Sequence, residues 1–250
     1  MKTRLEGIDV LCGVAAPWSE RLVAAARHRS DAIAIVMVGC VIAAIAPFDT
    51  AFAYLSNGSA LARVCLFAVI GTCGVFCAEK SGLQLRPSGL RCPTLTPIRI
   101  ALLVAVYVIV IDCVVFRTIV PQSTIELFRN VPLGPRLLGF MMRAWNENII
   151  YRLTVMSGLS WLIGFLWRSD GVRPAAGPLI LAAIIAQVIN ISMNVSEPSS
   201  PMLLVYDVVR YIPPGVLWGY LYWRNGFATA EIASVGTHPF LQPFFGVLIS

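Results

Sequence analysis

The sequence predicts an all-α protein, a polytopic membrane bundle of about seven transmembrane helices with an amphipathic segment at the interface. Hydrophobic residues make up 58% of its 250 positions and charged residues 13%, whereas a soluble domain carries roughly 25% charged residues. The apolar residues gather in blocks of about 17 to 23, close to the roughly 20 residues that a helix needs to cross a bilayer. This block length favours helices over the short alternating strands of a membrane barrel.

The apolar blocks define the predicted spans in chain order. They cover residues 31–48, 61–78, 98–116, 147–167, 177–195, 202–223 and 227–249. The fourth opens on Glu147, and the sixth contains Asp207, Arg210 and two adjacent prolines, so we expect the ends of these two to shift. Residues 1–30 carry scattered charge without an apolar run of signal-peptide length. We expect them to form a basic segment in the cytoplasm or at the interface, followed by one transmembrane domain over residues 31–250.

The distribution of lysine and arginine predicts the orientation of the chain. Basic residues occur in segments 1–30, 79–97 and 168–173 and at Arg224, whereas loops 49–60 and 196–201 contain none. By the positive-inside rule the N-terminus is cytoplasmic, and we expect a multi-pass protein of the bacterial inner membrane. The net charge of +6 is then a consequence of topology, and no nucleic-acid partner is expected.

Residues 117–146 do not follow this charge pattern. Arg129, Arg136 and Arg143 repeat every seven residues, which places them on one face of a helix. We therefore expect residues 117–146 to form an amphipathic stretch along the membrane interface.

Charged groups inside the spans are informative because each costs about 2.5 to 3.5 kcal/mol to insert. Arg63, Arg99 and Asp112 lie near span ends, where we expect them to reach the interface. The polar residues deeper in the last four spans are Glu147, Arg152, Asn190, Asn194, Asp207, Arg210, Glu231, His238 and Gln242.

Some of these residues have simple structural interpretations. Asp207 and Arg210 are three residues apart and can neutralise each other on one helix, which is the expected arrangement. Glu231 lies near the predicted cytoplasmic end of its span and is expected to reach water, with a catalytic role beside His238 as the alternative. A lone buried histidine such as His238 is more often a packed core residue than a catalytic one.

The predicted depths of the polar residues favour a shared site. With a cytoplasmic N-terminus, Glu147, Asn190, Asp207 and Gln242 fall in the outer half of the bilayer and His238 at its middle. We therefore expect one cavity that opens outward, in which a glutamate and a histidine could carry out proton transfer.

Two motifs carry a resemblance to a known family. The segment Glu147-Asn148-Ile-Ile-Tyr-Arg152 resembles the Glu-Glu-x-x-x-Arg motif of the CAAX prenyl endoprotease and bacteriocin-processing (Abi-type) membrane proteases. A glycine- and arginine-containing turn over residues 219–226, followed by His238-x-x-x-Gln242, resembles the last conserved region of that family. The middle motif, Phe-x-x-x-His, would fall where this chain has Ala186-Gln-Val-Ile-Asn190. The resemblance covers residues 140–245, and a branch associated with protein sorting is one interpretation of it.

The resemblance implies an intramembrane endopeptidase with a glutamate-activated water. Glu147 would be the general base, and His238 would orient the water or protonate the leaving amine. Asn190 would position water, and Gln242 would stabilise the oxyanion. The carry-over also gives supporting roles to four further residues: Asn148, Arg152, Asp207 and Arg210.

The departures from the family pattern are Asn148 for a glutamate, Asn190 for a histidine and Gln242 for an asparagine. Asn148 can bond to Arg152 but cannot neutralise it, so Asp207 or Glu147 is the expected counter-ion. No cofactor is expected, and a zinc site is not expected because one histidine and one carboxylate fall short of the usual three protein ligands.

The expected partners are the lipid bilayer and a membrane-anchored protein substrate, for example one with a C-terminal sorting helix, cleaved near the outer face. Two alternatives stay open. The substituted motif positions favour a catalytically inactive relative that acts as a membrane binding or immunity protein. Acidic residues within spans fit a small transporter, although paired discontinuous helices are not evident.

Overall fold

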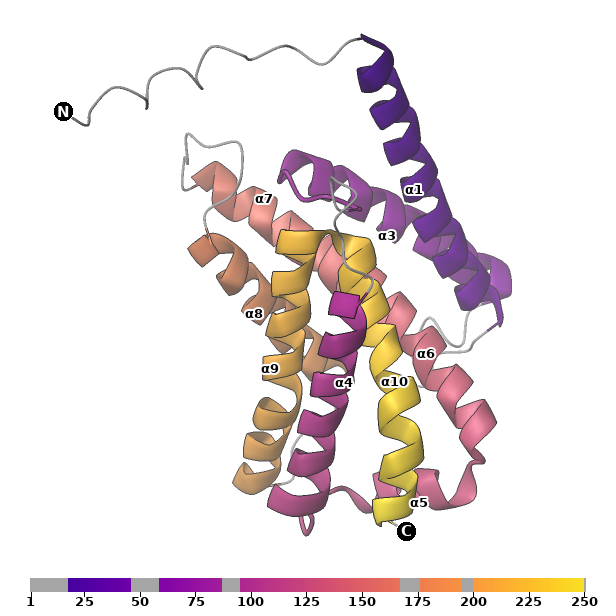
Figure 1. Ribbon diagram of the computed structural model, residues 1–250, viewed down its shortest axis with the longest axis vertical. Helices are drawn as coiled ribbons and strands as arrows, with labels where there is room; N and C mark the ends of the chain where they lie inside the picture. The colour runs from indigo at the N-terminus through magenta and orange to yellow at the C-terminus, as the bar shows by residue number, and fades with distance from the viewer. Residues whose placement is uncertain (1–17, 46–58, 87–94, 167–175, 195–199, 250) are drawn as a thin grey trace, which may run out of the picture.

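The computed structural model describes residues 18–45, 59–86, 95–166, 176–194 and 200–249. Within these residues the protein is helical and contains no strand, which confirms the all-α prediction. The loop segments that carry many of the charges behind the orientation prediction lie outside the described residues. The helices are α1 (Trp18–Ile45), α3 (Ala60–Lys80), α4 (Leu95–Val110), α5 (Gln122–Asn130), α6 (Leu133–Asn148), α7 (Ser157–Leu166), α8 (Ala176–Asn194), α9 (Pro201–Asn225) and α10 (Phe227–Ile249) (Figure 1).

Two π-helical turns interrupt this pattern. The first, η1 (Ile111–Val115), continues α4, and the second, η2 (Ile149–Met156), joins α6 to α7. As a result, α6, η2 and α7 form one helical rod over Leu133–Leu166.

Four helical stretches among the described residues are long and apolar enough to cross a bilayer. They are Ala60–Lys80, Leu95–Val115, Leu133–Leu166 and Ala176–Met193. The other three predicted spans overlap α1, α9 and α10. The polar groups and internal prolines of α9 and α10 lower their apolar character, because α9 contains Pro213 and Pro214 and α10 contains Pro239 and Pro243.

Two helices extend beyond the predicted spans. Helix α1 begins at Trp18, inside the segment that the charge pattern assigned to a basic arm. The helical rod that contains the fourth predicted span begins at Leu133, so the predicted interfacial stretch is divided between α5 and the first half of the rod. Val131 is extended because it precedes Pro132, and the α conformation is disfavoured before a proline. This break separates α5, which has no buried residue, from α6.

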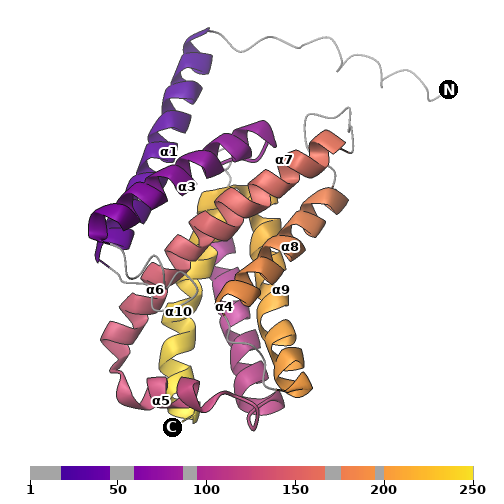
Figure 2. The same cartoon turned by 180° about the vertical axis from the view of Figure 1, so that it is seen from behind.

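The helices pack mainly in pairs. Helix α4 lies along α10, α1 along α3, and α8 along α9, while the rod contacts α10, α3 and α8. Figure 1 shows the rod crossing behind α9, α4 and α10, and Figure 2, from the opposite side, shows it in front of them, with α1 and α3 on one side of it. Successive long helices run in opposite directions between the two ends of the bundle. The end of α7 and the start of α8 lie at one end of the bundle, and the end of α9 and the start of α10 lie at that same end. The C-terminus lies at the opposite end, beside α5.

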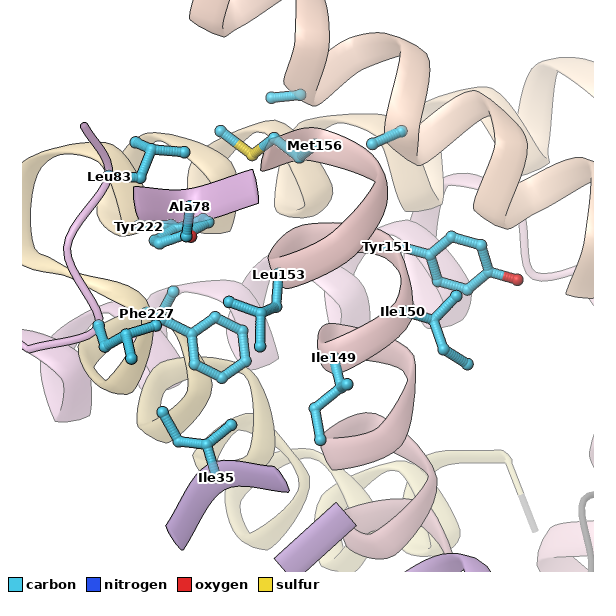
Figure 3. Close-up of a cluster of buried hydrophobic side chains, with 14 of the residues drawn as sticks. Ile35, Ala78, Leu83, Ile149, Ile150, Tyr151, Leu153, Met156, Tyr222 and Phe227 are labelled. Atoms are coloured by element: carbon cyan, nitrogen blue, oxygen red, sulfur yellow. The ribbon is translucent and has the colours of Figure 1, made fainter. Parts of the chain in front are cut away.

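The main hydrophobic core surrounds η2. Leu153, Ile149 and Met156 are each at most 1% exposed and pack with Tyr222 and Phe227 (Figure 3). Small residues let the neighbouring helices approach this core closely. A Cβ atom at Gly74 of α3 would lie 2.5 Å from Thr154 Oγ1, and one at Gly219 of α9 would lie 2.7 Å from Ala183 Cβ.

Candidate functional site

The sequence motif lies where the rod changes its helical geometry. Glu147 and Asn148 are the last residues of α6, and Arg152 lies inside the π-helical turn η2. Thr154 Oγ1 donates to the carbonyl oxygen of Ile149 at 2.9 Å, five residues back, as the wider turn allows. Such π-helical turns are frequent at functional sites, so the position of η2 is consistent with a functional site in this segment.

Glu147 is held by an arginine on its own helix. Arg143 Nε donates to Glu147 Oε1 at 2.6 Å, and the two side chains are 33% and 23% exposed. Phe140, Arg143 and Glu147 are spaced at three and four residues, which places them on one face of α6. The seven-residue repeat of arginines predicts only an interfacial stretch. The four-residue spacing from Arg143 to Glu147 is the sequence signal that points to their ion pair.

The same face of α6 meets His238 on α10. The Phe140 ring stacks on the His238 ring with 5.5 Å between centroids and 28° between planes. Arg143 and Arg210 are both close enough to act electrostatically on the imidazole. Within the described part of the chain, His238 Nδ1 is buried without a hydrogen-bond partner. The structure therefore brings Glu147 and His238 to two helix faces that pack together, with Arg143 near both.

Gln242 is engaged by a second buried arginine. Its Oε1 accepts from Arg136 Nε at 3.0 Å, and its carbonyl oxygen accepts from Arg136 Nη2 at 3.4 Å. Arg136 Nη1 also donates to the carbonyl oxygens of Phe128 and Val131 at 2.8 and 3.0 Å. These acceptors draw the Arg136 side chain into the contact between α5, α6 and α10, where it is buried.

Asn190 lies on a different side of the bundle. It is 8% exposed on α8, and α8 packs chiefly against α9 and η2, not against α10. One turn before it, Gln187 lies over Gly215 of α9. The side chain of Asn194 lies outside the described residues. Asn190 is thus buried, as predicted, but on the side of the bundle where α8 meets α9.

Arg210 pairs with Asp112, a residue that was predicted to lie near a span end and reach the interface. Its Nε lies 2.8 and 2.9 Å from the two carboxylate oxygens of Asp112, and the Tyr206 hydroxyl donates to Asp112 Oδ1 at 3.0 Å. Asp112 is fully buried, so the prediction that it reaches the interface is wrong. Asp207 is also buried and acts on Arg210 only electrostatically. The arginine side chain reaches across to α4, which spacing along α9 cannot reveal.

Arg152 is buried with an amide and an aromatic ring as its contacts. Asn148 Oδ1 accepts from its Nη1, and Trp218 of α9 lies under the guanidinium at 4.7 Å from the ring centroid. The carboxylates that act on it are Glu231 and, more weakly, Glu147. Asp207 is not among the carboxylates that act on Arg152, and Glu147 forms its ion pair with Arg143.

Glu231 does not reach the surface as predicted. It is 2% exposed, because it faces the rod and not the solvent. The Asn148 amide is close to it, but among the described residues neither carboxylate oxygen has a hydrogen bond of ordinary geometry. Asn148 Nδ2 and Arg152 Nε are likewise buried without a partner in that part of the chain. Clusters of this kind usually indicate a place for water or a ligand.

Comparison with models of known protein families, with curated proteins and with solved structures finds no match. Within the described residues, no group of three or more His, Cys, Asp or Glu side chains is placed to hold a metal ion. The candidate site is therefore defined by its own geometry, which consists of Glu147 and His238 with Arg143, and of Arg152 with Glu231 and Asn148.

Proposed function

We propose that this protein is an intramembrane endopeptidase in which Glu147 activates a water molecule. The observation that carries the proposal is the packing of α6 on α10, which stacks Phe140 on His238 and sets Arg143, the ion-pair partner of Glu147, on the same face of α6 as Phe140. The sequence resemblance over residues 140–245 supports the same chemistry independently of this packing.

The residues would share the hydrolysis as follows. Glu147 takes a proton from water as the water oxygen bonds to the scissile carbonyl carbon, and Arg143 orients the carboxylate. The carbon–nitrogen bond then breaks, and the proton passes to the leaving amine through His238, whose Nδ1 has no other partner in the described part. Gln242 accepts from Arg136 through Oε1. Arg136 precedes Glu147 by about 16 Å along α6, at 1.5 Å per residue, so Gln242 is given no part in the hydrolysis at Glu147.

The proposed setting is a seven-span protein of the bacterial inner membrane with its N-terminus in the cytoplasm. In this setting, helices α1, α9 and α10 would cross the membrane in addition to the four most apolar stretches. The substrate would be a membrane-anchored protein, such as one with a C-terminal sorting helix, cleaved on the outer side. Support comes from the alternating helix directions (Figure 1) and from the loop charges.

The test is co-expression of candidate tailed substrates with wild type, Glu147→Ala and His238→Ala. Glu126→Ala is the matched control, because Glu126 is an exposed glutamate on α5. We expect processing by wild type and Glu126→Ala, and its loss in the other two variants. Equal processing by all four proteins, at equal levels in the membrane, would exclude the proposal.

The second candidate function is that of a catalytically inactive relative that binds a membrane partner. The Arg143–Glu147 ion pair favours it, because a carboxylate bound at 2.6 Å to a guanidinium is less available to water. In that case a tailed protein that co-purifies with wild type would co-purify equally with Glu147→Ala and would never be cleaved.

A further inference from the structure

A small cavity lies between α1 and α10 and reaches Glu231. Its volume is about 170 Å³, and its polar lining consists of Asp31, Arg86 and Glu231. Trp145 and Phe227 add two aromatic rings, and aliphatic side chains of α1 and α10 complete the wall. The cavity includes neither Glu147 nor His238, so it is separate from the site of the proposed hydrolysis.

Glu231 is the buried polar group of this cavity. Its side chain is 2% exposed, and both carboxylate oxygens are unpartnered within the residues that the structure covers. Arg152 acts on this carboxylate electrostatically but donates no hydrogen bond to it. A buried polar group without a hydrogen bond is costly, so a donor from outside the chain would supply the bond that the described residues do not. Arg152 is not part of the lining, and its guanidinium is engaged by Asn148 and Trp218.

The charge of the lining selects the sign of the ligand. Among the described residues of the lining, two carboxylates face one arginine, which favours a cation. Arg86 lies 3.2 Å from Asp31, and its side chain is 61% exposed while that of Asp31 is 9% exposed. An incoming cation can therefore displace Arg86 toward solvent and gain Asp31 as a second contact.

The rest of the lining selects the kind of cation. Hard metal ions prefer six or more oxygen ligands, which two carboxylates within an apolar wall do not supply. Aromatic rings and aliphatic walls suit an organic ammonium group on a short apolar stem. At roughly 30 Å³ per water molecule, the cavity has room for about five or six waters, or a group of similar size.

We propose that this cavity is a binding site for a small alkylammonium ion, with Glu231 as its buried anchor and Asp31 at its mouth. The proposal does not depend on the hydrolytic function. It assigns Glu231 a ligand-binding role, and it assigns Arg86 the role of a competitor for Asp31.

The test is isothermal titration of the full chain in detergent with n-butylammonium chloride, beside n-butanol as a neutral probe of the same shape. We expect saturable binding of the ammonium ion and not of the alcohol. Glu231→Gln should weaken binding about tenfold or more, the scale of one charge-assisted contact. Arg86→Gln should strengthen it several-fold, since Arg86 is the basic residue among the described part of the lining.

Two further variants make the test independent of a folding defect in Glu231→Gln. Ile232→Trp fills the cavity from a side chain that is 55% exposed, so it should fold and lose binding. Glu126→Gln removes an exposed glutamate far from the cavity and should bind as wild type. Absence of binding to wild type, equal binding of alcohol and ammonium, or unchanged binding in Ile232→Trp would overturn the proposal.

Discussion

Arg152 is a buried charge whose hydrogen-bond partner is uncharged. Asn148 accepts a hydrogen bond from the guanidinium but carries no charge, and the carboxylate that acts most strongly on Arg152 comes from Glu231 on α10. Both Arg152 and Glu231 are at most 5% exposed, so solvent does not screen their interaction fully. We infer that Glu231 partly compensates for the absence of a charge at Asn148.

This compensation predicts a coupling between positions 148 and 231. Glu231→Gln should destabilise the protein more in the natural Asn148 background than in Asn148→Glu, which supplies a carboxylate beside Arg152. We expect a coupling of about 1 to 3 kcal/mol, typical of neighbouring charges in one network. Thermal unfolding of the four proteins in detergent measures it, with Glu126→Gln as control. Additive effects of the two substitutions would contradict the compensation.

At the scale of the elements, a buried ion pair joins α9 to the end of α4. Arg210 bonds to both oxygens of Asp112, and Asp112 also accepts from Tyr206. Removing one partner of such a pair leaves an uncompensated buried charge. The pair therefore fixes how α9 lies against η1, although the cost of removing the two charges from water nearly cancels the energy of their attraction.

Substitution at Asp112 should be more damaging than substitution at Asp207. We expect Asp112→Asn to lower the free energy of unfolding by about 3 to 5 kcal/mol, as for other broken buried pairs. Asp207→Asn, the control on the same helix as Arg210, should cost clearly less. Denaturant or thermal unfolding in detergent compares the two variants. The opposite order would indicate that Asp207 is the true partner of Arg210.

The contact of α8 with α9 depends on a glycine. A methyl group at Gly219 would lie 2.7 Å from Ala183 Cβ, whereas nothing lies within 4 Å of a Cβ at Gly164. We therefore expect Gly219→Ala to destabilise the protein by about 1 to 3 kcal/mol through overpacking. Gly164→Ala should be neutral or stabilising, because alanine favours a helix over glycine. Equal unfolding midpoints for the two variants would contradict this packing.

At the scale of the whole molecule, the direction of the helices is the feature with a functional consequence. Figure 1 shows the C-terminus and the start of α9 at one end of the bundle, and the start of α10 at the other. If the charge pattern sets the orientation, the C-terminus and the loop before α9 both face outward.

Reporter fusions test this orientation. Alkaline phosphatase fused after residue 250 or within residues 196–201 should be active, because that enzyme works only outside the cytoplasm. Fusion within residues 79–97 is the control and should be inactive. Activity of the 79–97 fusion with inactivity of the other two would invert the topology and move the outward-facing site to the cytoplasmic side.

The prediction from sequence was most successful where local pattern suffices. The segments 61–78, 177–195 and 227–249 match α3, α8 and α10 closely, because apolar length and helix-forming residues act along the chain. The helix that holds the fourth predicted span begins earlier than that span, because Arg136 and Arg143 lower the apolar character of a helix that nevertheless packs against α10. Charge within a helix does not reveal whether that charge finds a partner.

The sequence alone thus determined that this is an all-helical protein with long apolar helices. It singled out some of the polar residues that the bundle buries, such as Asp207 and Gln242, but not Asp112. Only the tertiary structure decided the partners: Arg143 for Glu147, Asp112 for Arg210, Arg136 for Gln242, and Glu231 as the carboxylate near Arg152. The physical reason is the length of the arginine side chain. Hydropathy depends on neighbours along the chain, whereas a long arginine side chain pairs across helix interfaces whose geometry follows from close packing at small residues.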